Sequence, residues 1–160
     1  MLFRSVSYGK IRDDGRTWLQ VLRQELEGQL DWNRIHALGP ISHSAFIRAM
    51  QISAVHVYFT YPFVLSWSLL EAMACGAMVI GSATAPVEEV IQDGHNGLLV
   101  DFFDQQGLID AVSSVLRSPA DTMAMRKNAR QTIKRRYRLE TCVQQQVTLV
   151  DAVAQGVIGG

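Results

Sequence analysis

The sequence lacks most of the features that would commit it to a special class of protein. Its 160 residues include only two cysteines and four prolines, and fifteen basic side chains balance fifteen acidic ones. Cys75 and Cys142 form no C-x-x-C motif and no disulfide framework, so a reducing, cytosolic setting fits. A formal charge of zero argues against broad nucleic-acid binding. Length and composition together indicate one globular domain with a core of its own.

The signals of several other classes are also missing from the sequence. No apolar run reaches roughly 18 residues, so no transmembrane helix is predicted, and the N-terminus does not look like a signal peptide. The four histidines show no metal-ligand spacing, and the Ser, His and Asp residues form no recognisable triad. No G-x-G-x-x-G follows a strand, which disfavours a dinucleotide-dependent oxidoreductase. We therefore expect no metal and no cofactor.

Hydrophobic patterning predicts strands that alternate with helices. Apolar, β-branched and aromatic runs predict strands at 2–8, 35–38, 55–60, 78–81 and 98–100. Helical spacing predicts helices at 16–27, after Ser42, and at 69–74, 86–92, 106–116, 120–137 and 139–153. This alternation indicates an α/β fold, a Rossmann-like parallel sheet with helices on both faces. Such sheets bind ligands at the carboxyl ends of their strands, where the loops after Leu38, Thr60 and Gly81 would converge.

Glu71 is the first candidate for a ligand contact. It lies on a short predicted helix that follows a strand and a loop and stops at Gly76. Helix N-termini attract phosphate, and a nearby carboxylate can hold sugar hydroxyls, so this pattern suits a nucleotide-sugar site. The alternative is structural. Ser68 and Glu71 have the S-x-x-E spacing of a capping box, and Ser66 is a second candidate for the N-cap.

Two loops at the same predicted edge would complete the site. The first would offer backbone N–H groups to a diphosphate, those of Phe63, Val64, Leu65 and Ser66. This loop has no glycine, however, so an apolar turn without a ligand is the alternative. The second loop would lie against the nucleotide base, through Gly39, Pro40 and Ile41. An ordinary turn is the alternative there.

A basic cluster occupies a helix predicted in the last third of the chain. Its members are Arg126, Lys127, Arg130, Lys134, Arg135, Arg136 and Arg138. Arg126, Arg130 and Lys134 fall on one stripe at i, i+4 spacing. A solvated helix face is the favoured interpretation. The alternative is peripheral contact of the cluster 126–138 with an anionic membrane surface, at ~1 kcal/mol for each nearby Lys or Arg.

The segment 61–81 resembles the C-terminal, donor-binding domain of family 4 (group 1) retaining glycosyltransferases, which have the GT-B fold. The run from Leu70 to Ile80 is similar to the leucine–glutamate–alanine–methionine–alanine segment of that family. Flanking pieces match in the same order, at 34–41, 46–58 and 86–100. The resemblance covers 18–137, and it implies that 1–160 is a single donor-binding domain, the C-terminal half of a GT-B glycosyltransferase.

The resemblance implies that a glycosyl group moves from a nucleotide-diphosphate sugar to a carbohydrate or lipid-linked acceptor, with retention and without a metal. The family motif has two glutamates separated by seven residues. Glu71 matches the second, which would hold the ribose hydroxyls. The first falls on Phe63, whose ring cannot accept a hydrogen bond from a sugar. The contact with the donor sugar therefore departs from the family pattern.

A second departure concerns the diphosphate. The arginine and lysine that the family places early in its donor domain have no match here, and the acceptor-binding domain is absent. We therefore expect a fragment, cut inside the donor domain, that is inactive alone and binds nucleotide weakly. Two alternatives stay open: another GT-B enzyme such as a sugar-nucleotide epimerase, or a non-catalytic binding module.

Overall fold

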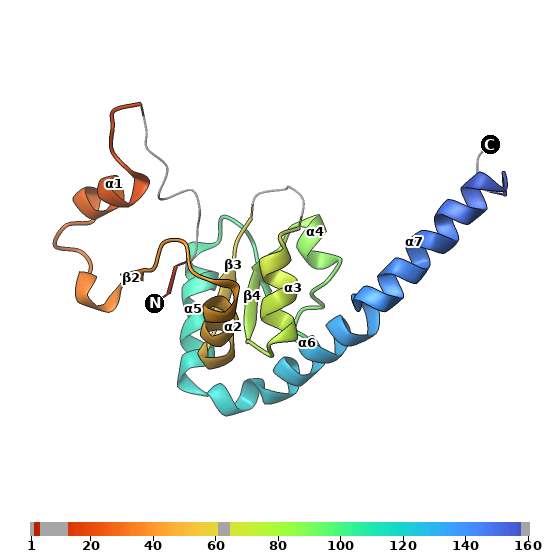
Figure 1. Ribbon diagram of the computed structural model, residues 1–160. Coiled ribbons are helices and arrows are strands. Elements are labelled where there is room, and N and C mark those ends of the chain that lie inside the picture. Colours follow the sequence, from red (N-terminus) through yellow and green to blue (C-terminus); the bar gives the residue numbers. More distant parts are fainter. Residues whose placement is uncertain (1, 4–12, 61–64, 158–160) are drawn as a thin grey trace. The chain divides into compact units, whose positions relative to one another are not determined.

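The computed structural model describes residues 2–3, 13–60 and 65–157 (Figure 1). Its contacts fall into two compact units, Met1–Phe46 and Ile47–Gly160. The sequence predicts one donor-binding domain over 1–160, and that assignment stays a prediction.

The first unit contains a small parallel sheet and a capped helix. Its elements are β1 (Leu2–Phe3), α1 (Trp18–Glu25), the 3-10 helix η2 (Trp32–Arg34), β2 (His36–Ala37) and the start of α2 (His43–Ile52). β1 pairs with β2 in parallel. Thr17 caps α1, because its hydroxyl accepts from the N–H of Gln20 while the Gln20 side chain accepts from the N–H of Thr17. Ser42 caps α2 by accepting from the N–H of Ala45, as the sequence predicts.

The second unit contains a parallel sheet with the strand order β3-β4-β5. Its elements are β3 (His56–Tyr58), α3 (Trp67–Ala74), β4 (Val79–Ser82), α4 (Ala85–Glu88), β5 (Leu98–Val100), α5 (Gln105–Arg117), η3 (Pro119–Thr122), α6 (Met123–Arg136) and α7 (Leu139–Ala154). Val57 lies beside Ile80, and Ile80 beside Leu98. The parallel sheet that the alternating pattern predicts is therefore confirmed.

Helices cover both faces of the central strand, β4. On one face Ile80 packs in a buried cluster with Val115 of α5. On the other face Gly81 meets the residues of α4 and the turn after it, Val87 and Ile91. Figure 1 shows α5 on one side of β4, with α3 and α4 on the other. All four residues of β4 are buried, which is typical of a parallel strand between two helical layers.

The end of α3 joins this helix to α6. Gly76 has a φ of +75°, its N–H donates to Met73 O, and the N–H of Ala77 donates to Ala72 O. These two bonds make a Schellman motif, so the predicted left-handed stop at Gly76 is confirmed. The Gly76 carbonyl accepts from Arg126 of α6 at 2.8 Å. The second helix is thereby tied to the end of the first.

Several element ends differ from the sequence prediction for local reasons. The helix predicted at 86–92 is the shorter α4, which ends at Glu88. The helix predicted at 120–137 begins later, at Met123, because Pro119–Thr122 form the 3-10 helix η3. The turn at 93–97 is only partly exposed, because Asn96 is buried and its side chain bonds to Val90 O and to the N–H of Gln92. The described helices include none that is long and apolar enough to cross a membrane.

We expect Gly81→Ala to destabilise the second unit. A β-carbon at this position would lie 2.8 Å from Val87 Cγ1 and 3.2 Å from Ile91 Cδ1, and Val87 is fully buried. Overpacking of this kind costs about 1–3 kcal/mol, measurable by urea unfolding. In a Val87→Ala background the same change should cost less, because the clashing methyl group is gone. An equal cost in both backgrounds would contradict this account.

We expect His56 to make stability depend on pH. Burial lowers the pKa of this imidazole below its ordinary 6.5, and its buried Nε2 has no partner among the described residues. The unfolded chain then binds the proton more tightly than the folded one. The free energy of unfolding should therefore fall as pH drops below 6.5, and level off below the folded-state pKa. His56→Leu should flatten this dependence in unfolding measurements made across that range.

Candidate functional site

A buried hydroxyl joins the carboxyl ends of β3 and β4. The N–H of Thr60 donates to Ser82 Oγ at 3.2 Å, and Ser82 Oγ donates to Thr60 O at 3.1 Å. Ser82 is fully buried. The strand register pairs Tyr58 with Gly81, so these side-chain bonds continue the pairing beyond the last residue of β3. The chain therefore leaves the sheet from a fixed point at Thr60.

A second hydroxyl holds the start of α3. The N–H of Ser66 donates to Tyr58 Oη at 2.9 Å. Ser66 is the N-cap of α3, because its hydroxyl accepts from the N–H of Ser68. Of the two capping alternatives, Ser66 is therefore correct. The capping box of Ser68 with Glu71 is wrong, because the helix begins two residues earlier than that pairing requires.

Glu71 lies in the second turn of α3, and the first turn contains no acidic residue. The side chain is half-buried. The Cα–Cβ bonds of a helix are tilted toward its N-terminus, which for Glu71 is the direction of the carboxyl edge of the sheet. From this place the carboxylate can accept hydrogen bonds from the hydroxyl groups of a ligand at that edge.

The neighbours of Glu71 include a thiol on its own helix. Burial raises the pKa of the Cys75 thiol, Glu71 adds to this rise, and Arg130 of α6 opposes it. A carboxylate, a thiol and a guanidinium group are thus near one another where α3 packs on α6. Cys75 is half-buried rather than buried, as the last residue before the Gly76 stop.

The structure describes some of the remaining predicted site residues and not others. Leu65 is half-buried and directly precedes the cap. Phe63 and Val64 lie outside the described residues. Gly39, Pro40 and Ile41 belong to the first unit, and Gly39 has a φ of +61° that suits the turn predicted there. Their contact with a nucleotide base stays a prediction.

Aromatic side chains lie at the same edge of the sheet, a feature that was not predicted from the sequence. Phe59, one residue beyond β3, lies 5.9 Å from Phe102 between ring centroids, and Phe102 lies 5.1 Å from Phe103. Phe103 is 78% exposed, although its N–H is held by the carboxylate of Asp101. The signal was available, because two adjacent aromatic residues directly follow the strand predicted at 98–100. Trp67, the first residue of α3, is also largely exposed.

The basic cluster divides into structural and solvated members. Arg126 is half-buried and donates to the carbonyls of Gly76 and Ser53, so the solvated-face interpretation is wrong for this residue. Arg136 donates to Glu89 O, although its side chain remains largely exposed. The exposed cations include Lys127, Arg130 and Lys134. Contact with an anionic membrane surface stays a prediction for these.

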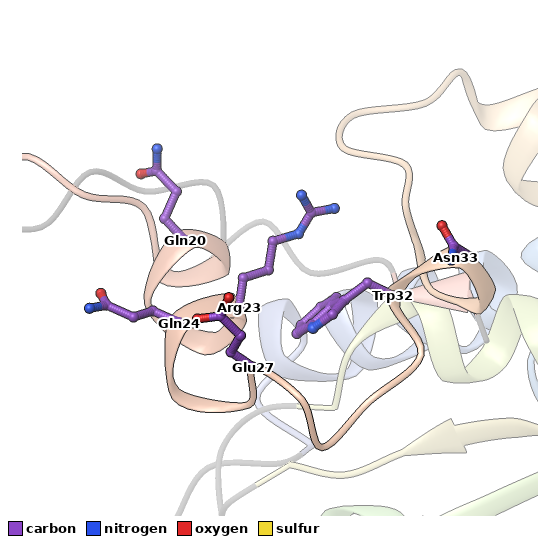
Figure 2. A pocket seen from close by; sticks show the side chains of 6 residues that line it. All are labelled: Gln20, Arg23, Gln24, Glu27, Trp32 and Asn33. Carbon is purple, nitrogen blue, oxygen red and sulfur yellow. The ribbon is translucent and has the colours of Figure 1, made fainter.

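A hollow of about 600 Å³ lies in the first unit (Figure 2). Its lining residues are Gln20, Arg23, Gln24, Glu27, Trp32 and Asn33. The guanidinium carbon of Arg23 lies 5.3 Å from the ring centroid of Trp32. Gln20 Oε1 and Gln24 Oε1 already accept from Thr17 N–H and from the Arg16 guanidinium. Two of the six lining side chains, Gln20 and Gln24, therefore already hold the segment at the start of α1.

No group of three or more His, Cys, Asp or Glu residues that could hold a metal ion occurs in the part of the chain that the structure describes. The groups described at the carboxyl edge include the carboxylates of Glu71 and Asp101, hydroxyl groups, exposed aromatic rings and the start of α3. These groups can bind a polar, hydroxyl-bearing molecule.

Comparison with known proteins identifies the family. The model of the family described as glycosyl transferases group 1 matches residues 12–132, which include the whole of α3 and the sheet of the second unit. The chain belongs to this family. The match covers the group 1 part of the predicted resemblance. The finer assignments, family 4 and retention, are not part of it.

Two curated relatives are about one-third identical to this group 1 chain over the segments that align. N-acetyl-alpha-D-glucosaminyl L-malate synthase of Bacillus anthracis is 36% identical over 81 residues, which are 51% of this chain and 21% of that protein. An uncharacterized glycosyltransferase of Methanocaldococcus jannaschii is 32% identical over 78 residues, 48% of this chain and 20% of that protein. The chain thus spans about a fifth of these relatives.

Solved structures with a similar fold include two larger proteins. HepE of Anabaena, solved with UDP-glucose, has a TM-score of 0.76 at 21% identity, over 84% of this chain and 37% of that one. Sucrose-phosphate synthase of Thermosynechococcus elongatus has a TM-score of 0.75 at 28% identity, over 91% of this chain and 36% of that one. The predicted fold class, a Rossmann-like half of a GT-B glycosyltransferase, is therefore confirmed.

We expect Ser66→Ala to destabilise the second unit and Ser68→Ala to have little effect. Only Ser66 caps α3 with its hydroxyl, and the loss of such a cap costs about 1 kcal/mol. Ser66→Asp should retain most of the stability, because aspartate is also a good N-cap. Thermal unfolding of the three variants checks this. Equal losses from Ser66→Ala and Ser68→Ala would contradict the assignment of the cap.

Proposed function

We propose that this protein, in its full-length form, transfers a glycosyl group from a nucleotide-diphosphate sugar to an acceptor with retention, as family 4 enzymes do. The acceptor would be a carbohydrate or a lipid-linked molecule. The observation that carries the proposal is the place of Glu71. It lies on a helix whose start is bonded to the end of β3, at the edge where parallel sheets bind ligands.

The proposed role of Glu71 is to accept hydrogen bonds from the ribose hydroxyls of the donor. Family membership and the matched motif support this role, and HepE, which has a similar fold, was solved with UDP-glucose. The start of α3 and the loop before it would stabilise the charge that develops on the departing diphosphate. This proposal places Phe63, Val64, Leu65 and Ser66 beside the diphosphate.

Glu71→Gln in the full-length protein tests the role of the carboxylate. A hydrogen bond to a charged group contributes about 1.5–3 kcal/mol, so kcat/KM for the sugar nucleotide should fall roughly ten- to hundredfold. Glu88→Gln is the matched control, because Glu88 is an exposed acid on α4. Steady-state kinetics with UDP-glucose and related donors measures both variants. Unchanged kinetics in Glu71→Gln would remove Glu71 from the site.

A second candidate function follows from Phe63. Phenylalanine at the position of the first family glutamate cannot hydrogen-bond a donor sugar, which favours a module that binds a nucleotide without transferring its sugar. The full-length protein would then bind UDP in calorimetry yet release neither glycosylated acceptor nor free sugar from UDP-glucose. Turnover with any sugar nucleotide would exclude this alternative.

A further inference from the structure

We propose that Tyr58 and Ser82 are positioning residues of the donor site, an inference that rests on the proposed function. Neither residue is expected to touch the donor. Instead, each hydroxyl holds one end of the segment that connects β3 to α3. Ser82 holds Thr60, where the chain leaves β3, and Tyr58 holds Ser66, where α3 begins.

Ser82 provides a rigid anchor. It ends β4, all of whose residues are buried, and its own side chain has no exposed surface. One hydroxyl both accepts from the N–H of Thr60 and donates to its carbonyl, across a separation of 22 residues. Because donor and acceptor functions are both used, this pair fixes the direction in which the chain leaves the sheet, as well as its distance from β4.

Tyr58 provides the second anchor, at the other end of the connection. It is the last residue of β3, and its half-buried ring carries the hydroxyl to the backbone of Ser66. Ser66 is the cap from which α3 starts, so the bond ties the first turn of this helix to the sheet. Glu71 follows on the same helix, and the place of its carboxylate therefore depends on this bond.

This positioning matters because the sequence of the connection lacks two features that help to bind a donor. It contains no glycine that would let the backbone wrap a phosphate closely, and Phe63 stands where the family has its first glutamate. Donor binding then depends on Glu71 and the start of α3 being held ready. Ordering a flexible group on binding costs entropy and weakens the affinity for the ligand, whereas a group that is already in place carries no such cost.

Four variants test the inference. Tyr58→Phe removes one oxygen and keeps the ring, and Ser82→Ala removes both bonds to Thr60. Ser53→Ala is the matched control, because the Ser53 hydroxyl donates to Val55 O at 2.7 Å at the opposite, amino end of β3. Glu71→Gln reports on the proposed function itself. If Ser82→Ala fails to fold, Tyr58→Phe alone decides the outcome.

Two measurements are made on each variant. Amide hydrogen exchange of this chain compares the N–H of Leu69 at the start of α3 with those of Gly76 and Ala77 at its end. UDP-glucose kinetics of the full-length protein separates KM from kcat. Tyr58→Phe should speed exchange at Leu69 about fivefold or more, leave the far end of α3 unchanged, and raise the donor KM roughly tenfold with little change in kcat. Ser53→Ala should change neither the exchange at Leu69 nor KM.

The outcomes separate the two proposals. If Glu71→Gln impairs donor use while Tyr58→Phe and Ser82→Ala behave as the unaltered protein, the inference is overturned and the proposed function stands. The inference is also overturned if Ser53→Ala raises KM as much as Tyr58→Phe, since the effect is then one of general stability. If the unaltered protein neither binds nor uses sugar nucleotides, both proposals fail.

Discussion

The burial of β4 between two helical layers is the constraint on which the second unit depends. Every residue of this strand is buried, so each face requires its own cover of apolar side chains. Ile80 meets α5, and Gly81 leaves room for Val87. Because no residue of β4 faces water, the strand has little freedom to shift, and a group bonded to its end is held in place as well. Ser82 ends β4, and its bonds to Thr60 hold the start of the connection that leads to the candidate site.

The helix that bears Glu71 is held at both ends by bonds of different kinds. Its start is bonded to Tyr58, and its end is closed by the Schellman motif at Gly76. Arg126, a residue of the basic cluster, donates to the Gly76 carbonyl and so holds the end of α3 against α6. A helix fixed in this way presents its side chains at constant places. That is the property a single carboxylate needs if it is to select and orient a sugar nucleotide.

Much of this fold could be predicted from local patterns, and the misses have physical causes. The strand at 98–100 and the stop at Gly76 depend on adjacent residues and were predicted correctly. The capping alternatives at Ser66 and Ser68 could not be separated, because both spacings are locally acceptable. The burial of Asn96 could not be predicted, since the composition of a turn does not reveal that Val90 O and the N–H of Gln92 bond to the Asn96 amide.

The sequence by itself determined the alternation of strands and helices, the family motif around Glu71 and the substitution of Phe63 within it. These features depend on neighbouring residues and on the periodicity of apolar residues. Only the tertiary structure decided that Ser82 bonds Thr60. It also decided that Arg126 is not solvated like its neighbours on the stripe but donates to the carbonyls of Gly76 and Ser53. Those partners lie 22, 50 and 73 residues apart. At such separations a polar side chain has many partners available in sequence, and the packing of helices on the sheet selects the ones it meets.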